Sequence, residues 1–360
     1  MNRDNRKVTI KDIAQRLGCS LSTVNKALTG KSGVSEKRRR EIQNAALEMG
    51  YEVNTVAQIM SRNPITIGVV IPDGNDRRYA NHFVALKKGM DREFAHLEKY
   101  RIHPAYYLLS DDPMCLDKER FSDWLTENEV EAVCYCPNFF ADEKIFIETT
   151  LEHRLPLFLC GGGMVPPEEC VTTFSVNSVH SGKIAADFFH CVYGDDVRAA
   201  VTIESYDTVS QRERVDAFCN RLHEYGIENV VVKESHLTQW DSEAMMKELF
   251  DSGADINCLY IATGLYEPVG RYIEEHGLVG KVTQIATDLT DAVAHGMKTG
   301  AVQAFFLQNQ QDIGRRKVRN IYDYLVRKRT FGNDDWQPPK RVYLAPRFCL
   351  KADLESLNEE

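Results

Sequence analysis

The N-terminal stretch Thr9–Thr29, TIKDIAQRLGCSLSTVNKALT, has the pattern of two short helices joined by a tight turn. Thr9 and Asp12 have the spacing of a capping box, and Gly18 can end the first helix in the left-handed conformation. Ser20 can cap the second helix. Apolar residues recur at helical spacing in both halves: Ile10, Ile13, Ala14, Leu17, Val24, Ala27 and Leu28. The pattern predicts a helix-turn-helix, whose second helix leads into the major groove of DNA; an ordinary helical hairpin is the alternative.

Charge separates this N-terminal part from the rest of the chain. The 360 residues carry a net charge of −9. Residues 1–62 hold twelve Lys and Arg against six Asp and Glu, a charge of +6, whereas the remainder carries −15. A basic head on an acidic body favours contact of the head alone with a polyanion. A solvated basic face with no partner is the alternative.

A third helix is expected over residues 36–49, with Ser35 as its N-cap. The residues expected to face inward are Ile42, Ala45, Ala46 and Met49. The basic run Lys37–Arg40 is dense enough to reach phosphates. Three helices around a small core would complete a DNA-binding headpiece.

The chain changes character after Pro64. The apolar run Ile65–Ile71 is typical of a strand buried on both faces of a parallel sheet. Further strands are expected at Ile102–Leu109, Leu157–Cys160, Thr172–Val176 and Ala199–Ile203, with helices between them. This alternation occurs in two series, which predicts two doubly wound α/β lobes with right-handed crossovers. We expect crossings between the lobes near Ser175, near Leu307 and within Asn333–Pro339.

No metal, cofactor or catalytic site is expected. The ten cysteines lack the paired spacings of a zinc site, and Cys134 and Cys136 lie on one face of an expected strand. We expect all ten to be reduced thiols. No Gly-x-Ser-x-Gly or HExxH motif occurs, and the histidines are scattered. The polar N-terminus and the lack of long apolar runs predict neither a signal peptide nor a membrane span, and hence a cytoplasmic protein.

The headpiece sequence is similar to that of the lactose-repressor (LacI/GalR) family of bacterial regulators. The residues that carry the resemblance are Thr9-Ile-Lys-Asp-Ile-Ala, Ser20, Thr23-Val24, the Gly50-Tyr51 pair and the short apolar segment that follows. In this family that segment is a hinge helix, which folds beside its twin in a homodimer on DNA. The resemblance implies a minor-groove hinge of Val56, Ala57 and Met60, with Met60 as the wedge where the family usually has Leu. A plain linker is the alternative.

The resemblance also implies which headpiece residues meet a pseudo-palindromic double-stranded operator. Base-reading positions fall on Leu21, Ser22 and Lys26. Lys26 can donate to guanine O6 and N7, Ser22 can donate or accept, and Leu21 can only offer an apolar contact. Phosphate-contacting positions, which set register, fall on Thr9, Ser20, Thr23, Asn25 and Ser35. For Leu21 and Lys26 the alternatives are packing against the turn and a solvated charge.

The remaining chain resembles, more loosely, the periplasmic-binding-protein fold that the family uses as its sensor. Such folds hold a small ligand between lobes, at the carboxyl ends of the strands. The effector-binding positions implied are Asp76, Tyr79, Phe83, Arg214, Asp288 and Gln308. The donors of Arg214 suit hydroxyls or a carboxylate, and Asp288 can accept from hydroxyls, so we expect a sugar or polyol. Local salt bridges or caps are the alternative roles.

Three departures from the family pattern limit this transfer. Val176-Asn177 stands where Asp-Asn is common, so Asn177 is expected to be structural. Thr263-Gly264 stands where Asn-Asp is common, which removes an expected polar contact. Cys160-Gly-Gly-Gly163 lacks the Lys-Ser/Thr of a phosphate loop, and we expect a connection near the rim between the lobes.

The sequence therefore predicts an all-α helix-turn-helix headpiece followed by a two-lobed α/β sensor of periplasmic-binding-protein-like, doubly wound parallel sheets. The expected divisions are a headpiece at 1–52, a hinge at 53–63, a sensor at 64–352 (N-lobe about 64–174 and 308–330, C-lobe about 175–307 and 331–352) and a tail at 353–360. The expected function is ligand-responsive transcriptional regulation, with repression released by a sugar-like effector or, with the opposite sign, assisted by it. A solute-binding protein and an α/β enzyme are the alternatives.

Overall fold

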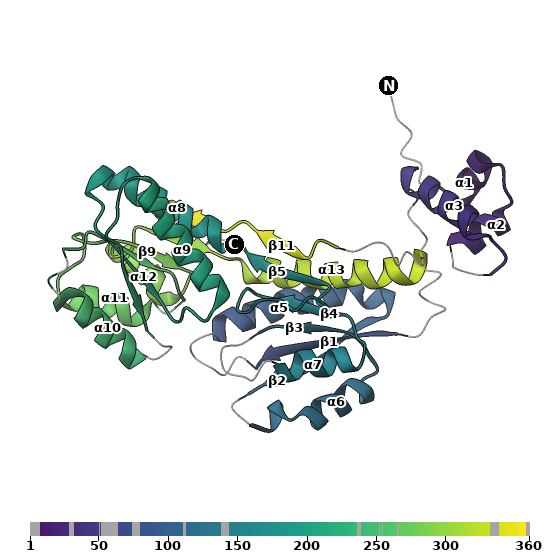
Figure 1. The fold of residues 1–360 in the computed structure, drawn as a ribbon, viewed down its shortest axis with the longest axis horizontal. Helices are drawn as coiled ribbons and strands as arrows, with labels where there is room; N and C mark the ends of the chain where they lie inside the picture. Colours follow the sequence, from purple (N-terminus) through teal and green to yellow (C-terminus); the bar gives the residue numbers. More distant parts are fainter. Residues whose placement is uncertain are drawn as a thin grey trace.

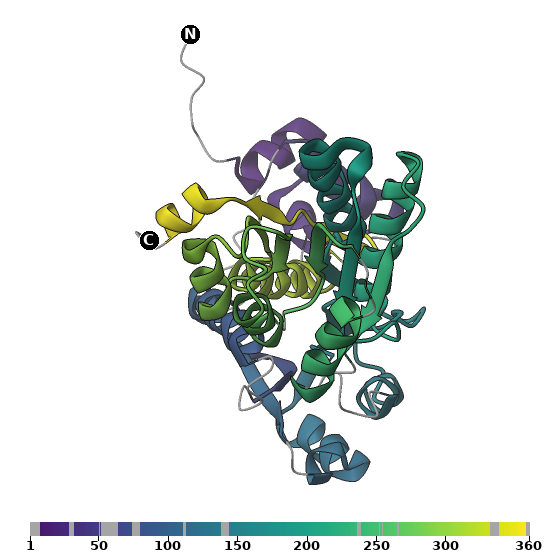
Figure 2. The same ribbon diagram turned by 90° about the vertical axis from the view of Figure 1, so that its left-hand side faces the viewer.

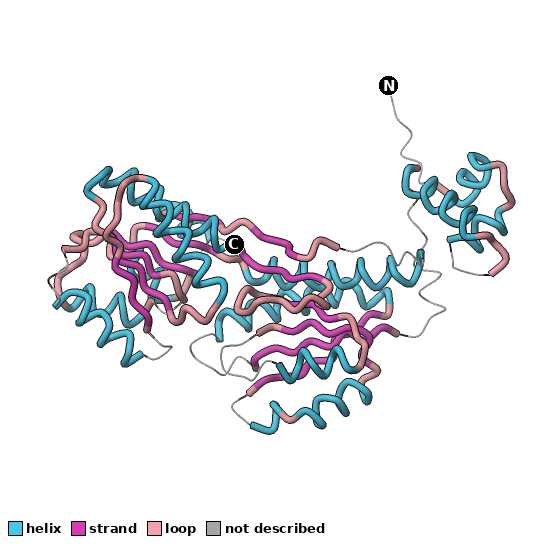
Figure 3. The backbone as a smooth tube through the Cα atoms, in the orientation of Figure 1, coloured by secondary structure: helices cyan, strands magenta, loops and turns pink. Residues whose placement is uncertain are grey.

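The chain forms a small helical headpiece and two α/β lobes, as seen in a computed structural model (Figure 1). In each lobe the strands form a central sheet with helices on both sides (Figure 3). No helix among the residues described is both long enough and apolar enough to cross a membrane. The structure describes residues 8–28, 32–49, 51, 64–73, 80–110, 113–137, 144–235, 239–251, 253, 255–264, 266–331 and 338–357.

The headpiece consists of α1 (Ile10–Leu17), α2 (Leu21–Leu28) and α3 (Glu36–Glu48). The predicted caps are present: the Thr9 amide donates to the Asp12 carboxylate at 2.7 Å, and Gly18 adopts a φ of 58°. The Ser20 hydroxyl accepts from the Thr23 amide at 3.0 Å. The buried core is made of Ile13, Ala14, Val24, Ala27, Leu28, Ile42 and Ala46. The apolar faces expected from the sequence therefore meet in one cluster.

The N-lobe is built on a six-stranded parallel sheet. In spatial order its strands are β11 (Arg341–Leu344), β5 (Thr172–Val176), β4 (Leu157–Cys160), β3 (Val130–Tyr135), β1 (Ile65–Pro72) and β2 (Ile102–Leu109). One face is covered by α5 (Ala80–Leu97) and α13 (Gln310–Phe331), the other by α6 (Lys118–Glu127) and α7 (Lys144–Glu152).

The C-lobe has the same winding, and it faces the viewer when the molecule is turned (Figure 2). Its strands in spatial order are β12 (Arg347–Cys349), β10 (Ala304–Leu307), β9 (Thr283–Thr287), β8 (Cys258–Ile261), β6 (Ala199–Ile203) and β7 (Val231–Glu234). One face is covered by α8 (Ser178–Tyr193) and α9 (Val209–Glu224), the other by α10 (Gln239–Asp251), α11 (Glu267–Glu275), α12 (Asp291–Thr299) and α14 (Lys351–Leu357).

The chain crosses between the lobes after β5, after β10 and after β11. The first two crossings lie where the sequence predicts them. The third was predicted within Asn333–Pro339, and this is wrong, because β11 still belongs to the N-lobe sheet and pairs with β5 from Arg341↔Thr173 to Leu344↔Val176. The crossing falls between Leu344 and Arg347, so the assignment of 331–352 to the C-lobe is also corrected.

The C-terminal segment predicted as a tail contains a helix. The Leu350 amide donates to the Asp353 carboxylate at 2.9 Å, which caps α14, and Leu354 is buried against the C-lobe core. The prediction of a tail from residue 353 is therefore wrong for Asp353–Leu357. One apolar side chain in a short polar segment was too weak a signal for a helix.

Two glycines allow α5 and α13 to pack unusually closely. A Cβ on Gly89 would lie 2.0 Å from the Gln311 carbonyl oxygen, and one on Gly314 would lie 2.2 Å from that of Leu86. Backbone lies against backbone at both positions, so neither neighbour can move aside alone. The two helices, far apart in sequence, therefore form one rigid layer of the N-lobe.

Replacing Gly89 or Gly314 with Ala is expected to lower the free energy of unfolding by about 1–3 kcal/mol, because the added methyl forces the helices apart. Urea denaturation followed by circular dichroism measures this. Gly264→Ala is the matched control, since a Cβ there meets nothing within 4 Å. Equal midpoints for all three variants and the native chain would contradict the close approach.

Candidate functional site

The outer face of α2 presents the residues predicted to read bases. Leu21, Ser22 and Lys26 are all exposed, as is Asn25 beside them. Leu21 is 47% exposed, so it does not pack against the turn in the way the alternative required. A large apolar side chain in water on an otherwise polar helix face is suited to an apolar contact with a partner.

Most of the predicted phosphate contacts have a structural role in the headpiece. The Ser20 and Thr23 hydroxyls lie 2.8 Å apart and share a hydrogen bond. The Thr9 hydroxyl donates to Asp12 at 2.6 Å, and the Ser35 hydroxyl accepts from the Arg38 amide at 3.4 Å. These residues sit at helix N-termini, where backbone amides and helix dipoles favour an anion.

The basic run on α3 divides into two pairs. Arg38 donates to the Leu17 carbonyl at 2.8 Å, and Arg39 donates to the Lys26 carbonyl at 3.1 Å. These two guanidinium groups therefore satisfy the carboxyl-terminal ends of α1 and α2. Lys37 and Arg40 are exposed and are the members of the run that can reach a phosphate. The predicted hinge residues Val56, Ala57 and Met60 lie outside the described residues, as do Asp76 and Tyr79.

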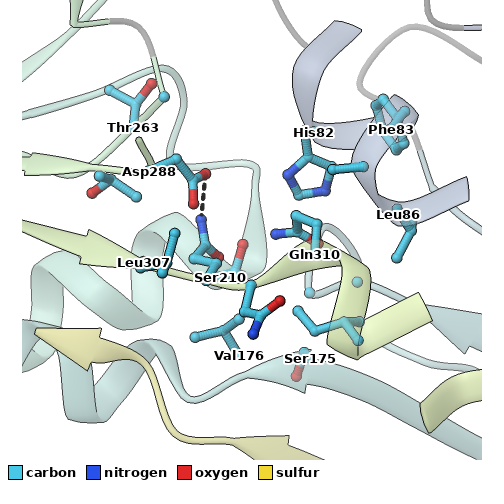
Figure 4. Close-up of a pocket in the computed structure, with 18 of the residues that line it drawn as sticks. His82, Phe83, Leu86, Ser175, Val176, Ser210, Thr263, Asp288, Leu307 and Gln310 are labelled. Atoms are coloured by element: carbon cyan, nitrogen blue, oxygen red, sulfur yellow. Dashed lines mark hydrogen bonds between the residues drawn. The ribbon is translucent and has the colours of Figure 1, made fainter. Parts of the chain in front are cut away.

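A cleft of about 760 Å³ separates the two lobes (Figure 4). It lies at the carboxyl ends of strands from both sheets, where doubly wound folds bind ligands. Phe83, Arg214, Asp288 and Gln308 all line it. The structure thus brings together every predicted effector-binding residue that it describes.

Asp288 follows β9 and points into the cleft (Figure 4). Its φ of 63° is in the left-handed region, and its amide donates to the Phe306 carbonyl at 2.8 Å, which fixes the turn. Gln308 donates from Nε2 to Asp288 Oδ2 at 2.7 Å. Burial raises the pKa of the Asp288 carboxyl, while His82, Arg214 and Gln308 lower it. The carboxylate is thus held with one oxygen engaged by protein and little water around it.

Arg214 reaches the cleft from α9. Its Nη1 donates to the Ala262 carbonyl at 2.6 Å, whereas its Nε is buried without a hydrogen-bond partner. Only 5% of this residue is exposed. A buried N–H without an acceptor is unfavourable by about 1–3 kcal/mol, so an acceptor supplied by a ligand would be bound strongly.

A second polar group lies beside Arg214. Glu204 is 1% exposed, and Gln211 donates to its Oε2 at 2.6 Å. Thr263 donates from its hydroxyl to the other carboxylate oxygen. Thr263 therefore makes a polar contact at the cleft, although the sequence pattern indicated that one was missing there. These bonds hold the start of α9, and with it Arg214, in a fixed position.

The N-lobe side of the cleft is formed by the first turn of α5. His82 faces Asp288 across the gap (Figure 4). Burial lowers the pKa of His82, and the Asp288 charge raises it. Phe83 is buried and provides part of the apolar wall. The cleft thus combines a carboxylate, a guanidinium and an imidazole from two lobes.

The loop Gly161–Gly163 lies at the rim between the lobes, as the sequence predicts. Its carbonyls at Gly162 and Gly163 accept from the Ser210 and Val209 amides at 2.8 and 3.2 Å. A Cβ on Gly162 would lie 2.8 Å from that of Ser210, so only glycine allows this approach. The loop is a contact of the N-lobe with the amino-terminal end of α9.

Sequence reasoning missed His82, Glu204 and Gln211. His82 precedes the predicted Phe83 directly, so its position was available as a signal. Glu204 directly follows the buried strand β6, and a carboxylate there indicates a binding edge. Asn177 is structural, as predicted, since its side chain accepts from the His180 amide at 2.9 Å and caps α8.

Residues 9–54 match the model of "Bacterial regulatory proteins, lacI family", and residues 161–329 match that of the "Periplasmic binding protein domain". A DNA-binding headpiece joined to a two-lobed sensor with a ligand cleft defines a ligand-responsive transcriptional regulator. The HTH-type transcriptional regulator MalR of Streptococcus pneumoniae is 24% identical over 280 residues, which is 75% of this chain and 81% of MalR. The chain belongs to the LacI family of bacterial regulators.

Solved structures agree with this fold along nearly the whole chain. The regulator CelR in complex with cellobiose has a TM-score of 0.62 at 20% identity, covering 96% of this chain and 99% of CelR. The lac repressor dimer bound to operator and the anti-inducer ONPF has a TM-score of 0.60 at 16% identity, covering 95% and 98%. The two lobes and the headpiece are therefore arranged in the chain as in these regulators.

Replacing Asp288 with Asn is expected to stabilise the ligand-free protein at pH 7 by on the order of 1 kcal/mol, because a buried carboxylate is removed. Asn also tolerates a positive φ. Since burial raises the folded-state pKa of Asp288, its unfavourable effect is present above that pKa and disappears as the pH falls towards the unfolded value. The difference between the two proteins should therefore shrink on acidification.

Thermal unfolding from pH 7 to pH 4 measures this difference. Asp207→Asn, at an exposed position outside the cleft, is the control and should change stability little. A D288N protein that is less stable than the native chain at pH 7 would contradict the prediction.

Proposed function

We propose that this regulator is a repressor that is released from its operator by a small sugar or polyol bound between the lobes. The observation that carries the proposal is the cleft, in which Arg214 and Asp288 of the C-lobe face His82 of the N-lobe. A ligand that bonds to both sides stabilises the closed arrangement of the lobes and no other.

The chemistry of the cleft favours a neutral, hydroxyl-rich effector. The buried Nε of Arg214 needs an acceptor, and the free oxygen of Asp288 needs a donor. A hydroxyl group supplies both, whereas a dianion would meet Asp288 and Glu204 close by. Phe83 and Leu307 give apolar walls for the faces of a ring. The volume is within the range of about 300–1,000 Å³ that holds small ligands.

The proposed mechanism couples the cleft to the headpiece through a homodimer. Closure of the lobes shifts the paired N-lobes against each other and separates the two hinge helices of residues 53–63. An isolated hinge helix is too short to remain folded, so Met60 leaves the minor groove. The headpieces, at residues 1–52, then bind as independent weak units. Such a protein would work in the cytoplasm.

On DNA, we propose that Leu21, Ser22 and Lys26 read bases in each half of a pseudo-palindromic operator. Their exposure on one face of α2 supports this role. Thr9, Ser20, Thr23, Asn25 and Ser35 would set the register on the phosphates.

Two measurements on the full chain test the proposal: a thermal-shift screen against sugars, polyols, sugar phosphates and nucleosides, and operator binding with and without any ligand found. A ligand at about 100 times its Kd adds roughly 2.7 kcal/mol to stability. A neutral polyhydroxylated ligand that weakens operator binding supports the proposal, and one that strengthens it reverses the sign.

Deleting residues 1–62 distinguishes the alternatives. A regulator loses DNA binding and keeps the effector, whereas a solute-binding protein shows no operator binding in either form. Turnover of a ligand by the truncated or the full chain would indicate an enzyme. A blank across all four ligand classes would count against the proposed effector.

Lys26→Ala is expected to weaken binding to the cognate operator by about 1–3 kcal/mol and to relax the preference at one base position of each half-site. Gel-shift measurements against operators varied one base pair at a time would detect it. Lys11→Ala removes an exposed charge from α1 and is the control, with no change in base preference. Equal weakening on every sequence would make Lys26 a phosphate contact.

Arg214→Met is expected to raise the Kd for the effector by at least about tenfold, because the ligand loses a charge-assisted hydrogen bond. Arg212→Met is the matched control: it lies on the same helix, but its Nη1 donates to the Tyr206 carbonyl at 2.9 Å, away from the cleft. Isothermal titration calorimetry gives both values. An unchanged Kd for R214M would remove Arg214 from the effector site.

A further inference from the structure

Lys317 is a charged group buried in the N-lobe core with very little to bind it. It lies on α13 and is fully buried. Its Nζ donates to the Thr172 carbonyl at 3.1 Å and lies 4.9 Å from the centre of the Phe174 ring. In the described part of the chain, no carboxylate pairs with it. A buried ammonium without a counter-ion is strongly unfavourable, so its surroundings call for an explanation.

The titratable groups around Lys317 are thiols. Cys134, Cys136, Cys160 and Cys170 each favour its charged form, which opposes the lowering of its pKa by burial. Cys136 hydrogen-bonds to the thiols of both Cys134 and Cys160. The pKa of Cys134 is lowered by the bond with Cys136 and by Lys317, against the effect of burial. The cation therefore favours negative charge on a chain of three connected thiols.

The strand register places two of these thiols beside each other. β3 and β4 pair in parallel, with Cys134↔Phe158 and Tyr135↔Leu159. The next step of this register brings Cys136 opposite Cys160. Directly opposed residues of neighbouring strands are about 4.8 Å apart, which is within the Cα separation of disulfides.

One member of the chain of thiols can be reached from outside. Cys160 is 4% exposed and lines the effector cleft, whereas Cys134 and Cys136 are fully enclosed. Cys160 directly precedes the Gly161–Gly163 loop, whose carbonyls bind the start of α9. A small reagent in the cleft would thus meet Cys160 first.

We propose that Cys160 and Cys136 form a peroxide-sensitive dithiol at the floor of the cleft, which Lys317 makes reactive. The Cys160 sulfur attacks a hydroperoxide, the O–O bond breaks, and the products are a Cys160 sulfenic acid and an alcohol or water that takes the thiol proton. Cys136 then displaces water from the sulfenic acid to form the disulfide. Two thiols lose two electrons in total, and the peroxide gains them.

Disulfide formation would also alter the effector site. The bond draws Cys160 towards Cys136, away from the cleft, and pulls on the loop that contacts α9. The interlobe hydrogen bonds at Gly162 and Gly163 depend on the position of this loop. Oxidation is therefore expected to weaken binding of the effector, and a dithiol reductant should restore it.

The experiment treats the full-length, ligand-free chain with hydrogen peroxide, blocks the remaining thiols and maps peptides by mass spectrometry. The expected product is a Cys136–Cys160 cross-link. In Cys136→Ser, dimedone should trap the sulfenic acid at Cys160, and in Cys160→Ser neither product should form. Cys191→Ser, at an exposed cysteine, is the control and should leave the cross-link unchanged. Circular dichroism verifies that each variant is folded.

Lys317→Met tests the role of the cation. Loss of a charge that favours thiolate is expected to slow cross-linking roughly tenfold, the effect of raising a thiol pKa by one. Oxidation confined to Cys191, or over-oxidation of Cys160 without a cross-link, would overturn the dithiol. An unchanged rate in folded K317M would overturn the assignment to Lys317, and if K317M does not fold, the Cys136 and Cys160 variants still decide the dithiol.

Discussion

The constraint on which the sensor depends is that the chain passes between the lobes at one edge and nowhere else in the described residues. β5, β10 and β11 each end at a crossing, and their ends lie at the same side of the cleft. Val176 and Leu307, at two of these ends, also line the cleft. Movement of the lobes is therefore a rotation about strands that the effector contacts directly, so binding and closure involve the same residues.

The cleft is an electrostatic compromise that only a ligand resolves. Arg214 has a buried donor without an acceptor, and burial raises the pKa of Asp288. Glu204, by contrast, has both oxygens bonded by the protein. The satisfied carboxylate fixes the shape of the site, and the incompletely satisfied groups leave free energy for a ligand to recover. Stability in the ligand-free state is thus lower at the residues that bind, as is common in functional sites.

The sequence predicted the strands best where both faces are buried. β2, β4, β5 and β6 have the predicted bounds, because parallel buried strands are continuous apolar runs. β11 was missed because its side chains alternate between exposed and half-buried, so Arg341–Leu344 forms no apolar run. Asp288, Arg214 and Gln308 were found by resemblance. His82 was not, since its role depends on α5 facing the other lobe, which no local pattern encodes.

Rigidity within the N-lobe limits how closure can reach the headpiece. α5 and α13 are locked by glycine contacts, so the lobe moves as one body. The headpiece has its own core, which ends at Tyr51, and is joined covalently to β1 only through residues 52–63. Rotation of the C-lobe leaves this link unaltered within a single chain. The signal therefore requires a second N-lobe against which the first can shift, and a monomer of this architecture would bind effector without changing its affinity for DNA.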